Sequence, residues 1–314
     1  MGNLIFALNA TVPVFILMLL GMWFRKVGLF DEHMTGKLNQ FVFKVSLPAL
    51  LFRDLAGENF YEAWDGKFVL FCFLVTLLSI LIAFGVALLW KDASIRGEFV
   101  QASYRSSAAL LGIAFIENIY GNAGMAPLMI IGTVPLYNIV AVLALCLLKP
   151  ERGQLDRKLL LQTGKGILTN PIILGIAVGL LWSLLQIPQP VILSKTVNNI
   201  AALTTPLGLM AMGAAFEYRK AFAKVKPALI CTVLKLIGFC AIFLPLAVRF
   251  GYRKEQLVAI LVMLGSATTV SSYIMAKNMG HEGTLSSSVV MLTTFFSAFT
   301  LTGWLYMLKS LALI

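Results

Sequence analysis

The sequence predicts an all-α polytopic membrane protein, and two observations carry this prediction. Of the 314 residues, 59% are hydrophobic and only 12% are charged, whereas soluble domains carry about 25% charged residues. A soluble protein of this size would need more charge to cover its surface. The apolar residues also gather in runs near the roughly 20 residues that a membrane-spanning helix needs.

Ten apolar runs are candidate membrane spans. In the first half they cover residues 4–24, 37–54, 68–90, 99–120 and 125–148. In the second half they cover residues 167–187, 196–216, 227–249, 256–279 and 286–308. The first run has no basic residues before it, so we expect a span rather than a cleaved signal peptide.

The basic residues set the expected orientation. The net charge is +11, and loops after odd-numbered spans hold about twice as many Lys and Arg residues as the other side. We therefore expect those loops in the cytoplasm and both termini outside, although the loop after span 8 goes against the trend. No basic tail or aromatic RNA-binding motif suggests nucleic acid as a partner.

Neither a metal ion nor another cofactor is expected. The four cysteines lie in apolar runs without a C-x-x-C pair, and the two histidines lie in loops. These patterns are typical of buried structural cysteines rather than metal ligands.

The two halves of the chain resemble each other at a fixed offset of 158 residues. Four pairs match in register: Pro13 with Pro171, Gly21 with Gly179, Lys37 with Lys195, and Pro48 with Pro206. We expect a first five-helix repeat at 1–149, a cytoplasmic linker at 150–166 and a second repeat at 167–314. Because each repeat has an odd number of spans, the second is inverted relative to the first, as in many secondary transporters.

A cluster of hydroxyl side chains lies inside span 9. It comprises Ser266, Thr268, Thr269, Ser271, Ser272 and Tyr273. Such side chains can satisfy the backbone of a helix that is broken within the membrane, and the second half-helix would then offer its N-terminus to an anion. The alternative is close packing between unbroken helices. The equivalent span 4 carries Ser106, Ser107 and Gly112.

Four ionisable residues lie within the apolar runs: Lys44, Arg105, Glu117 and Lys235. Each costs about 2.5–3.5 kcal/mol at the centre of a spanning helix. Lys235 is the deepest; it is a structural partner, a fixed cation in place of a coupling ion, or a proton carrier. Arg105 is a candidate for substrate or gating contact, and structural roles are favoured for Lys44 and Glu117. Three basic groups against one acidic group favour a pathway for anions.

Six motifs along the chain resemble the auxin efflux carrier family, which includes plant PIN carriers and bacterial malate or malonate permeases. They are LPALLF (47–52), YRSSAALLGIA (104–114), PLYNIVAV (135–142), NPIILGIAVGLL (170–181), TTPLGLMAMGAAF (204–216) and TTVSSYIMAKNMG (268–280). The chain departs from the family where Ala114 and Thr268 replace the usual prolines and Ser107 replaces an asparagine. We expect the breaks to persist, because the surrounding polar residues remain.

The resemblance implies ten spans in a 5+5 inverted repeat, with broken spans 4 and 9 crossing as in sodium–proton antiporters and bile-acid symporters. Spans 1, 2, 6 and 7 would form a scaffold, and spans 3–5 and 8–10 a transport domain that moves like an elevator, often in a dimer. The candidate substrate contacts are Arg105, Ser107, Gly112, Ala114, Phe115, Asn138, Ser266, Thr268, Thr269, Ser271 and Ser272. For Asn138, a bond between helices is the alternative. Lys235 and Glu117 are candidates for coupling or charge compensation.

The expected function is a secondary transporter for a small organic anion in a bacterial inner membrane. The anion would be a mono- or dicarboxylate of the auxin or the malate and malonate type, with H⁺ or Na⁺ as candidate coupling ions. The alternative is a membrane receptor or sensor that uses the same fold without net transport. An enzyme is not expected, because the spans hold neither paired carboxylates nor a Ser-His arrangement.

Overall fold

A computed structural model describes residue 13 and residues 16–56, 65–108, 116, 119–120, 125–148, 169–216 and 224–314. Within these residues the regular structure is helical, without strands. Four of the described helices are long and apolar enough to cross a membrane: Gly66–Leu88, Leu128–Leu147, Val225–Arg249 and Thr284–Ser310. The described regular structure is therefore helical as predicted, and these four helices are consistent with an integral membrane protein.

The helices of the first half follow one another with short interruptions. They are a helix at 16–26, α2 (Glu32–Phe41), the π-helical turn η1 (Val42–Ser46), α3 (Leu47–Ala56), α4 (Gly66–Leu88), the short η2 (Ala93–Ile95), α5 (Arg96–Tyr104) and α7 (Ala126–Leu147). Asp31 and Asp65 cap α2 and α4, since their carboxylates accept hydrogen bonds from Met34 N (2.6 Å) and Phe68 N (3.1 Å). Such caps satisfy amide groups that a helix start leaves unpaired.

The second half is also built from helices with short interruptions. Its elements are α9 (Pro171–Leu184), α10 (Val191–Ala202), α11 (Thr204–Ala214), α13 (Val225–Val233), the π-helical turn η4 (Leu234–Gly238), α14 (Phe239–Arg249), α15 (Lys254–Gly265), α16 (Ser271–Asn278) and α17 (Thr284–Ser310). Two lysines predicted within spans lie in the π-helical turns, Lys44 in η1 and Lys235 in η4. Lys44 is exposed, whereas Lys235 is completely buried.

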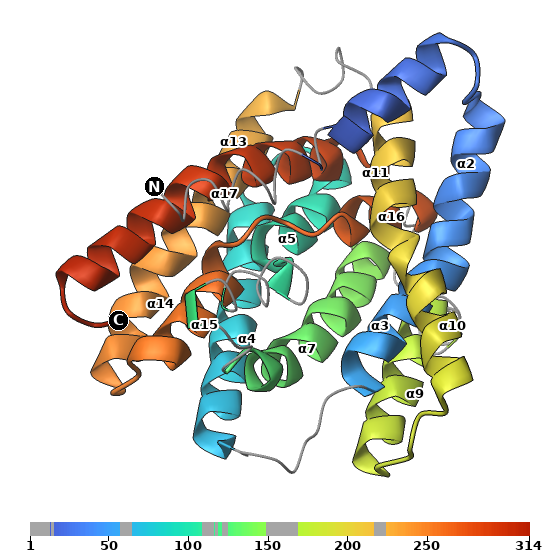
Figure 1. Cartoon of the computed structure of the whole chain (residues 1–314). Helices are drawn as coiled ribbons and strands as arrows, with labels where there is room; N and C mark the ends of the chain where they lie inside the picture. The colour runs from blue at the N-terminus through green and yellow to red at the C-terminus, as the bar shows by residue number, and fades with distance from the viewer. Residues whose placement is uncertain are drawn as a thin grey trace, which may run out of the picture.

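The helices form two groups, which Figure 1 shows side by side. The smaller helix group contains residues 16–56 and 169–216, in which α3 packs against α9 and α10, and α2 packs against α11. The larger helix group contains residues 65–108, 125–148 and 224–314, with α4, α5 and α7 packed together and α17 against α13 and α15. Helix α16 belongs to the larger group and also touches α2 and α11.

Glycines bring the helices of the smaller group into close contact. A Cβ atom on Gly21 would overlap the carbonyl oxygen of Met210, and a Cβ atom on Gly179 would lie 3.1 Å from the Cα of Phe52. Gly21 and Gly179 are 158 residues apart, and so are Phe52 and Met210. The offset found in the sequence therefore maps one contact onto the other. Glycine therefore permits the same close backbone approach at two equivalent positions.

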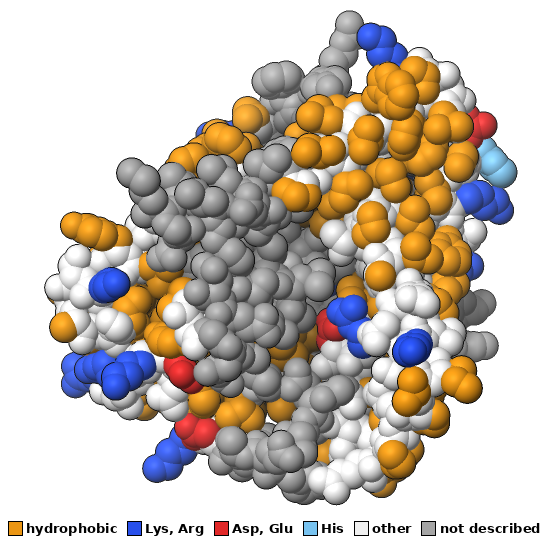
Figure 2. Space-filling model, viewed as in Figure 1, with side chains coloured by type: hydrophobic (Ala, Val, Ile, Leu, Met, Phe, Trp, Pro, Cys, Tyr) orange, Lys and Arg blue, Asp and Glu red, His pale blue; other side chains and the backbone are white. Residues whose placement is uncertain are grey.

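The outer surface is apolar where a membrane would cover it. Figure 2 shows hydrophobic side chains over much of the face where the 16–26 helix and α2 lie. Large hydrophobic side chains are also exposed along α4, among them Leu70, Leu74 and Leu78. Such an exposed apolar surface suits lipid better than water.

Candidate functional site

Two helices of the larger helix group end close to each other. Helix α5 ends at Tyr104, and Arg105 is extended, with φ −69° and ψ 136°. Helix α15 ends at Gly265, and Ser266 is extended, with φ −75° and ψ 160°. The chain then becomes helical again at Ser271, where α16 begins. The segment predicted as span 9 is thus interrupted, with threonine at 268.

The extended segments after α5 and α15 are joined by hydrogen bonds. The Ser107 N–H donates to the carbonyl oxygen of Ala267 at 2.9 Å. The Thr268 hydroxyl donates to the carbonyl oxygen of Ala102 at 2.8 Å, and the Thr268 N–H donates to Thr293 Oγ1 at 3.0 Å. Each bond gives a partner to a backbone N–H or C=O group. Without that partner, the group would be unpaired in an apolar interior, which costs free energy. Residues 105–107 and 266–270 together are called the crossing below.

Arg105 lies at the crossing and is buried, with only 2% of its surface exposed. Its Nη2 atom donates to Asn138 Oδ1 and to Ser271 Oγ, both at 2.7 Å. Its Nε atom has no hydrogen-bond partner among the described residues. No carboxylate in the described part of the chain forms an ion pair with it. The guanidinium is therefore a buried positive charge that neutral groups hold in place.

A cavity of about 50 Å³ lies beside Arg105, between α3 of the smaller helix group and the crossing. We call it the central cavity. Its lining includes Arg105, Ser107, Asn138, Thr269 and Ser271 from the larger helix group, and Leu47, Leu50, Leu51 and Asp54 from the smaller one. Helix α16 begins at this cavity without a side-chain cap. A helix N-terminus carries partial positive charge, so it adds to the field of Arg105 there.

The carboxylate in this lining belongs to Asp54. It accepts hydrogen bonds from Arg53, its neighbour in the chain, at 2.9 Å from Nε and 2.7 Å from Nη2. Arg53 therefore balances the charge of Asp54, and the cavity remains positive on the side of Arg105.

Lys235 is completely buried next to the crossing and is not part of the central cavity's lining, although its partner Ser106 is. Its Nζ atom donates to the carbonyl oxygen of Tyr104 at 3.2 Å and to Ser106 Oγ. Ser106 in turn donates to the carbonyl oxygen of Met263, which also accepts from the Tyr137 hydroxyl at 3.1 Å. A chain of hydrogen bonds thus joins the lysine to the last turns of both α5 and α15.

The predicted site residues divide into three sets. Arg105, Ser107, Asn138, Thr269 and Ser271 line the central cavity. Thr268 pairs backbone groups at the crossing, whereas Ser266 and Ser272 are buried and are not part of the cavity lining. Gly112, Ala114, Phe115 and Glu117 lie outside the described residues.

Sequence reasoning missed several residues that shape the site. Gln101 donates to the carbonyl oxygen of Ser272 at 2.8 Å and accepts from Arg105 at 3.4 Å. Its position four residues before Arg105 places it on the same helix face, a signal that was available. Tyr137 lines the central cavity next to Asn138 and bonds the Met263 carbonyl, and helix spacing gave no signal for it, because adjacent helix residues do not share a face. Asp54 gave no comparable signal, because it lies at the end of an apolar run.

Comparisons with known proteins agree with this picture. The family described as "Membrane transport protein" matches residues 6–305 of the chain. A protein of Rhizobium meliloti (strain 1021) described as "Putative malonate transporter" is 24% identical over 324 aligned positions, which cover 96% of both chains.

Proposed function

Because the chain belongs to the auxin efflux carrier family of membrane transport proteins, we propose that it is a secondary transporter for a small organic anion. Arg105 carries this proposal. A buried guanidinium without a carboxylate partner among the described residues is costly in a membrane protein, and such groups mark substrate paths. A carboxylate substrate would supply the missing negative charge.

The proposed substrate is a dicarboxylate of the malonate type. The printed description of the Rhizobium relative motivates this choice, and the central cavity, at about 50 Å³, suits a small anion. One carboxylate would lie between Arg105 and the start of α16, where Asn138 and Ser271 already hold the guanidinium. The Nε–H group of Arg105, which has no partner among the described residues, is a free donor for this carboxylate, and hydrogen bonds between charged groups are the strong ones.

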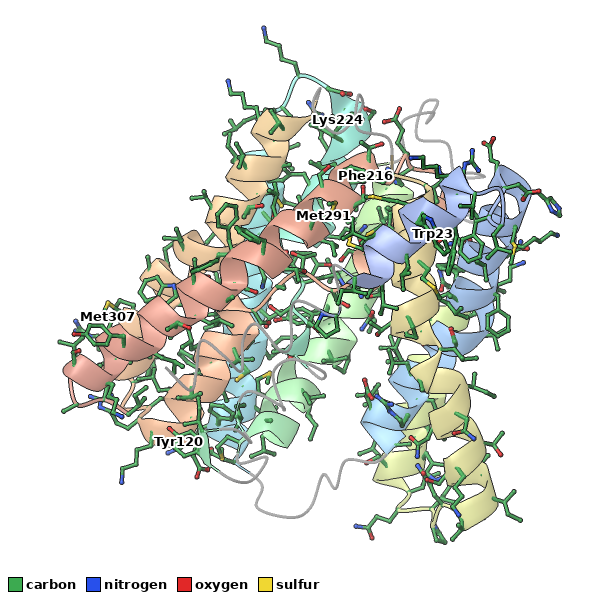
Figure 3. The ribbon with its side chains drawn as sticks, turned by 45° about the horizontal axis from the view of Figure 1, so that its top comes forward. Trp23, Tyr120, Phe216, Lys224, Met291 and Met307 are labelled. Carbon is green, nitrogen blue, oxygen red and sulfur yellow. The ribbon has the colours of Figure 1, made fainter. Side chains whose placement is uncertain are left out.

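The proposed topology is ten spans in a 5+5 inverted repeat, with spans 4 and 9 broken where they cross. The bond between Ser107 and Ala267 supports the crossing. The equivalent contacts of Gly21 and Gly179 support the repeat, because the offset of 158 relates them. In this topology both termini face outward. Figure 3 shows Lys224 and Tyr120 at opposite ends of the larger helix group. Lys224 would lie at the cytoplasmic end and Tyr120 at the outer end.

The proposed mechanism is an elevator motion. The smaller helix group would be the scaffold, and the larger group, which carries the crossing and Arg105, would be the transport domain. The site supports this division, because one wall of the central cavity comes from α3 and the other walls come from the larger group. Movement of one group past the other would then change the side from which the cavity is reached.

Lys235 is proposed to supply a fixed positive charge at the crossing, in place of a bound coupling ion. Its bonds to Tyr104 and Ser106 support this role, because they hold the ammonium against the negative end of α5. Whether H⁺ or Na⁺ drives uptake is tested by imposing each gradient separately across proteoliposomes.

The test of the proposed function is uptake of labelled malonate into proteoliposomes by the wild-type chain and by Arg105→Gln. We expect Arg105→Gln to lower malonate affinity about 30-fold or more, since losing one partner of a buried charge pair costs about 2–5 kcal/mol. Arg96→Gln is the matched control, because Arg96 is the first residue of the helix that ends just before Arg105 and donates to the Trp90 carbonyl instead. Malonate binding without uptake would identify a receptor, and equal affinity in both variants would remove Arg105 from the site.

A further inference from the structure

A second, larger cavity lies between the two helix groups. Its volume is about 550 Å³, and it is lined by the end of the 16–26 helix, by α2, by the end of α11 and by the end of α16. We call it the vestibule. It shares no lining residue with the central cavity. Its size would admit a small dicarboxylate together with part of its water shell.

The vestibule is lined by more positive than negative charge. Arg25 and Lys277 face it from different helix groups, and Glu32 is the acidic residue among its described lining residues. Lys277 is also close to Glu282, but Glu282 forms an ion pair with Lys224 at 2.6 Å. No ion pair with Arg25 or Lys277 occurs in the described ranges. Both cations are therefore available to an anion.

The deepest polar group of the vestibule is the side chain of Asn39. Asn39 is only 3% exposed, and its Oδ1 atom has no hydrogen-bond partner among the described residues. Its Nδ2 atom lies 3.5 Å from the Tyr273 hydroxyl, and its backbone oxygen accepts from Asn278 Nδ2 at 3.2 Å. Because a tyrosine hydroxyl can also donate, the amide can turn over and bond Tyr273 through Oδ1. Its N–H groups would then be free for a carboxylate.

Helix α16 connects the vestibule to the central cavity. Ser271, its first residue, lines the central cavity, while Lys277 and Asn278 at its other end line the vestibule. Six residues of helix span about 9 Å. The contact between Asn39 and Tyr273 lies between these two ends. An anion in the vestibule would therefore be one short step from Arg105.

We propose that the vestibule is an acceptance site, in which Arg25, Lys277 and Asn39 bind a small dicarboxylate before it enters the central cavity. This proposal rests on the proposed function, since it names the same substrate class. The vestibule concentrates the anion through its charge, and Arg105 selects it at the crossing. Clefts lined by charge of one sign raise the local concentration of the oppositely charged ligand.

The first test measures charge selectivity without relying on transport. Gly36 lines the vestibule, and a Cβ atom there would meet nothing within 4 Å, so Gly36→Cys fits. The rates at which an anionic and a cationic thiol reagent modify this cysteine are compared in the purified protein at low salt. The parent chain gives the baseline, because Cys72, Cys231 and Cys240 are buried and Cys146 is half-buried.

We expect the anionic reagent to react faster, and malonate to slow its reaction. Removing both cations with Arg25→Gln and Lys277→Gln should lower the ratio of anionic to cationic rates about threefold for each charge. The control removes two other cations at the same end, Lys26 and Lys37, which are exposed but do not line the vestibule. A ratio that falls equally in both double variants would overturn the site, and a failure of malonate to protect would overturn the dicarboxylate assignment.

The second test measures malonate uptake by the same variants, in proteoliposomes that hold the protein with its proposed cytoplasmic end facing the external solution. We expect Arg25→Gln/Lys277→Gln to raise the half-saturating malonate concentration about tenfold at low salt with a similar maximal rate, and to lose most of its salt dependence. Uptake with unchanged half-saturation would overturn the acceptance site and leave the proposed function intact. The wild-type chain could also fail to take up malonate while its cysteine labelling is charge-selective and protected by malonate. That result would support the anion site and reject transport of malonate.

Discussion

Lys235 Nζ lies 3.2 Å from the carbonyl oxygen of Tyr104, the last residue of α5. The ammonium thus caps the negative end of a helix that stops inside the protein, where carbonyl groups would otherwise lack partners. Through Ser106 the same ammonium is connected to Met263 in α15. One side chain therefore holds the ends of both α5 and α15 at the crossing.

Lys235→Met is expected to abolish transport while the protein remains folded. The change removes the donor to Tyr104 and Ser106, and one unpaired buried acceptor costs about 1–3 kcal/mol. The variant also no longer buries a charge, and this gain offsets part of the cost of the unpaired acceptors. The decrease in unfolding free energy should therefore be small. Malonate uptake and thermal unfolding in detergent measure the two effects.

The matched control for this prediction is Lys44→Met. Lys44 also lies in a π-helical turn of a predicted span, but it is exposed. We expect normal uptake in this control. If Lys235→Met transported at the wild-type rate with the wild-type pH dependence, Lys235 would have no role in coupling.

Arg105→Lys is expected to weaken malonate binding about tenfold or more, although the charge is kept. A lysine has three N–H donors at a single nitrogen, so it cannot spread them over Asn138, Ser271 and both oxygens of a substrate carboxylate as the five donors of a planar guanidinium can. Equilibrium binding of malonate measures the effect. Equal affinity for the Arg and Lys chains would mean that only the charge matters at this position.

Two neighbouring threonines are expected to behave differently. Thr268→Val should lower the unfolding free energy by about 1–3 kcal/mol, because it leaves the Ala102 carbonyl without this donor. Thr269 lines the central cavity and bonds Ser271 Oγ at 3.1 Å, so Thr269→Val should mainly change malonate affinity. Thermal unfolding and binding are measured for each variant. The same effect in both would contradict this separation.

Gly21→Ala and Gly213→Ala are each expected to destabilise the protein by about 1–3 kcal/mol or more, as overpacked cores do. A Cβ atom at Gly213 would overlap the carbonyl oxygen of Met18, as one at Gly21 would overlap that of Met210. Gly85→Ala and Gly303→Ala are the controls, because a Cβ atom there meets nothing within 4 Å. These helical controls should be neutral or stabilising by up to about 1 kcal/mol. Equal unfolding temperatures in all four variants would contradict the close approach.

Glu98→Gln is expected to loosen the connection between α5 and α17. The buried Glu98 carboxylate accepts from Gly283 N at 2.9 Å and from Ser286 N at 2.8 Å, so it caps the start of α17. An amide keeps one acceptor oxygen and loses the charge that favours a helix N-terminus, which costs about 1 kcal/mol. Thermal unfolding measures this loss, with Glu255→Gln as the control at the start of α15. A change no larger than that control would mean that the charge of Glu98 is unimportant.

The helical architecture could be predicted from hydrophobicity, because apolar runs of about 20 residues, long enough to cross a membrane as a helix, are easily recognised in a sequence. The site could be foreseen only in outline. Arg105 was conspicuous as a charge within an apolar run, and the hydroxyl residues of span 9 were conspicuous as a cluster. The separate roles of Thr268 and Thr269 could not be predicted from the sequence. The two residues are chemically identical, and only the direction of each side chain from the extended backbone distinguishes them.

Residues that act between distant segments were harder to foresee. Asn39 gains its importance from α16, more than 200 residues away in the chain, since it bonds both Tyr273 and Asn278. Neither its own helix nor its neighbours signal that contact. Asp54 likewise becomes relevant only because α3 faces the crossing.

The two helix groups are interleaved along the chain, which passes from one to the other through residues 57–64, 149–168 and 217–223. Any displacement of one group against the other must be accommodated by these connections together. In the proposed elevator motion, the connection whose ends lie farthest apart for its length would limit the displacement, and deleting residues there would restrict transport without changing any residue of the central cavity.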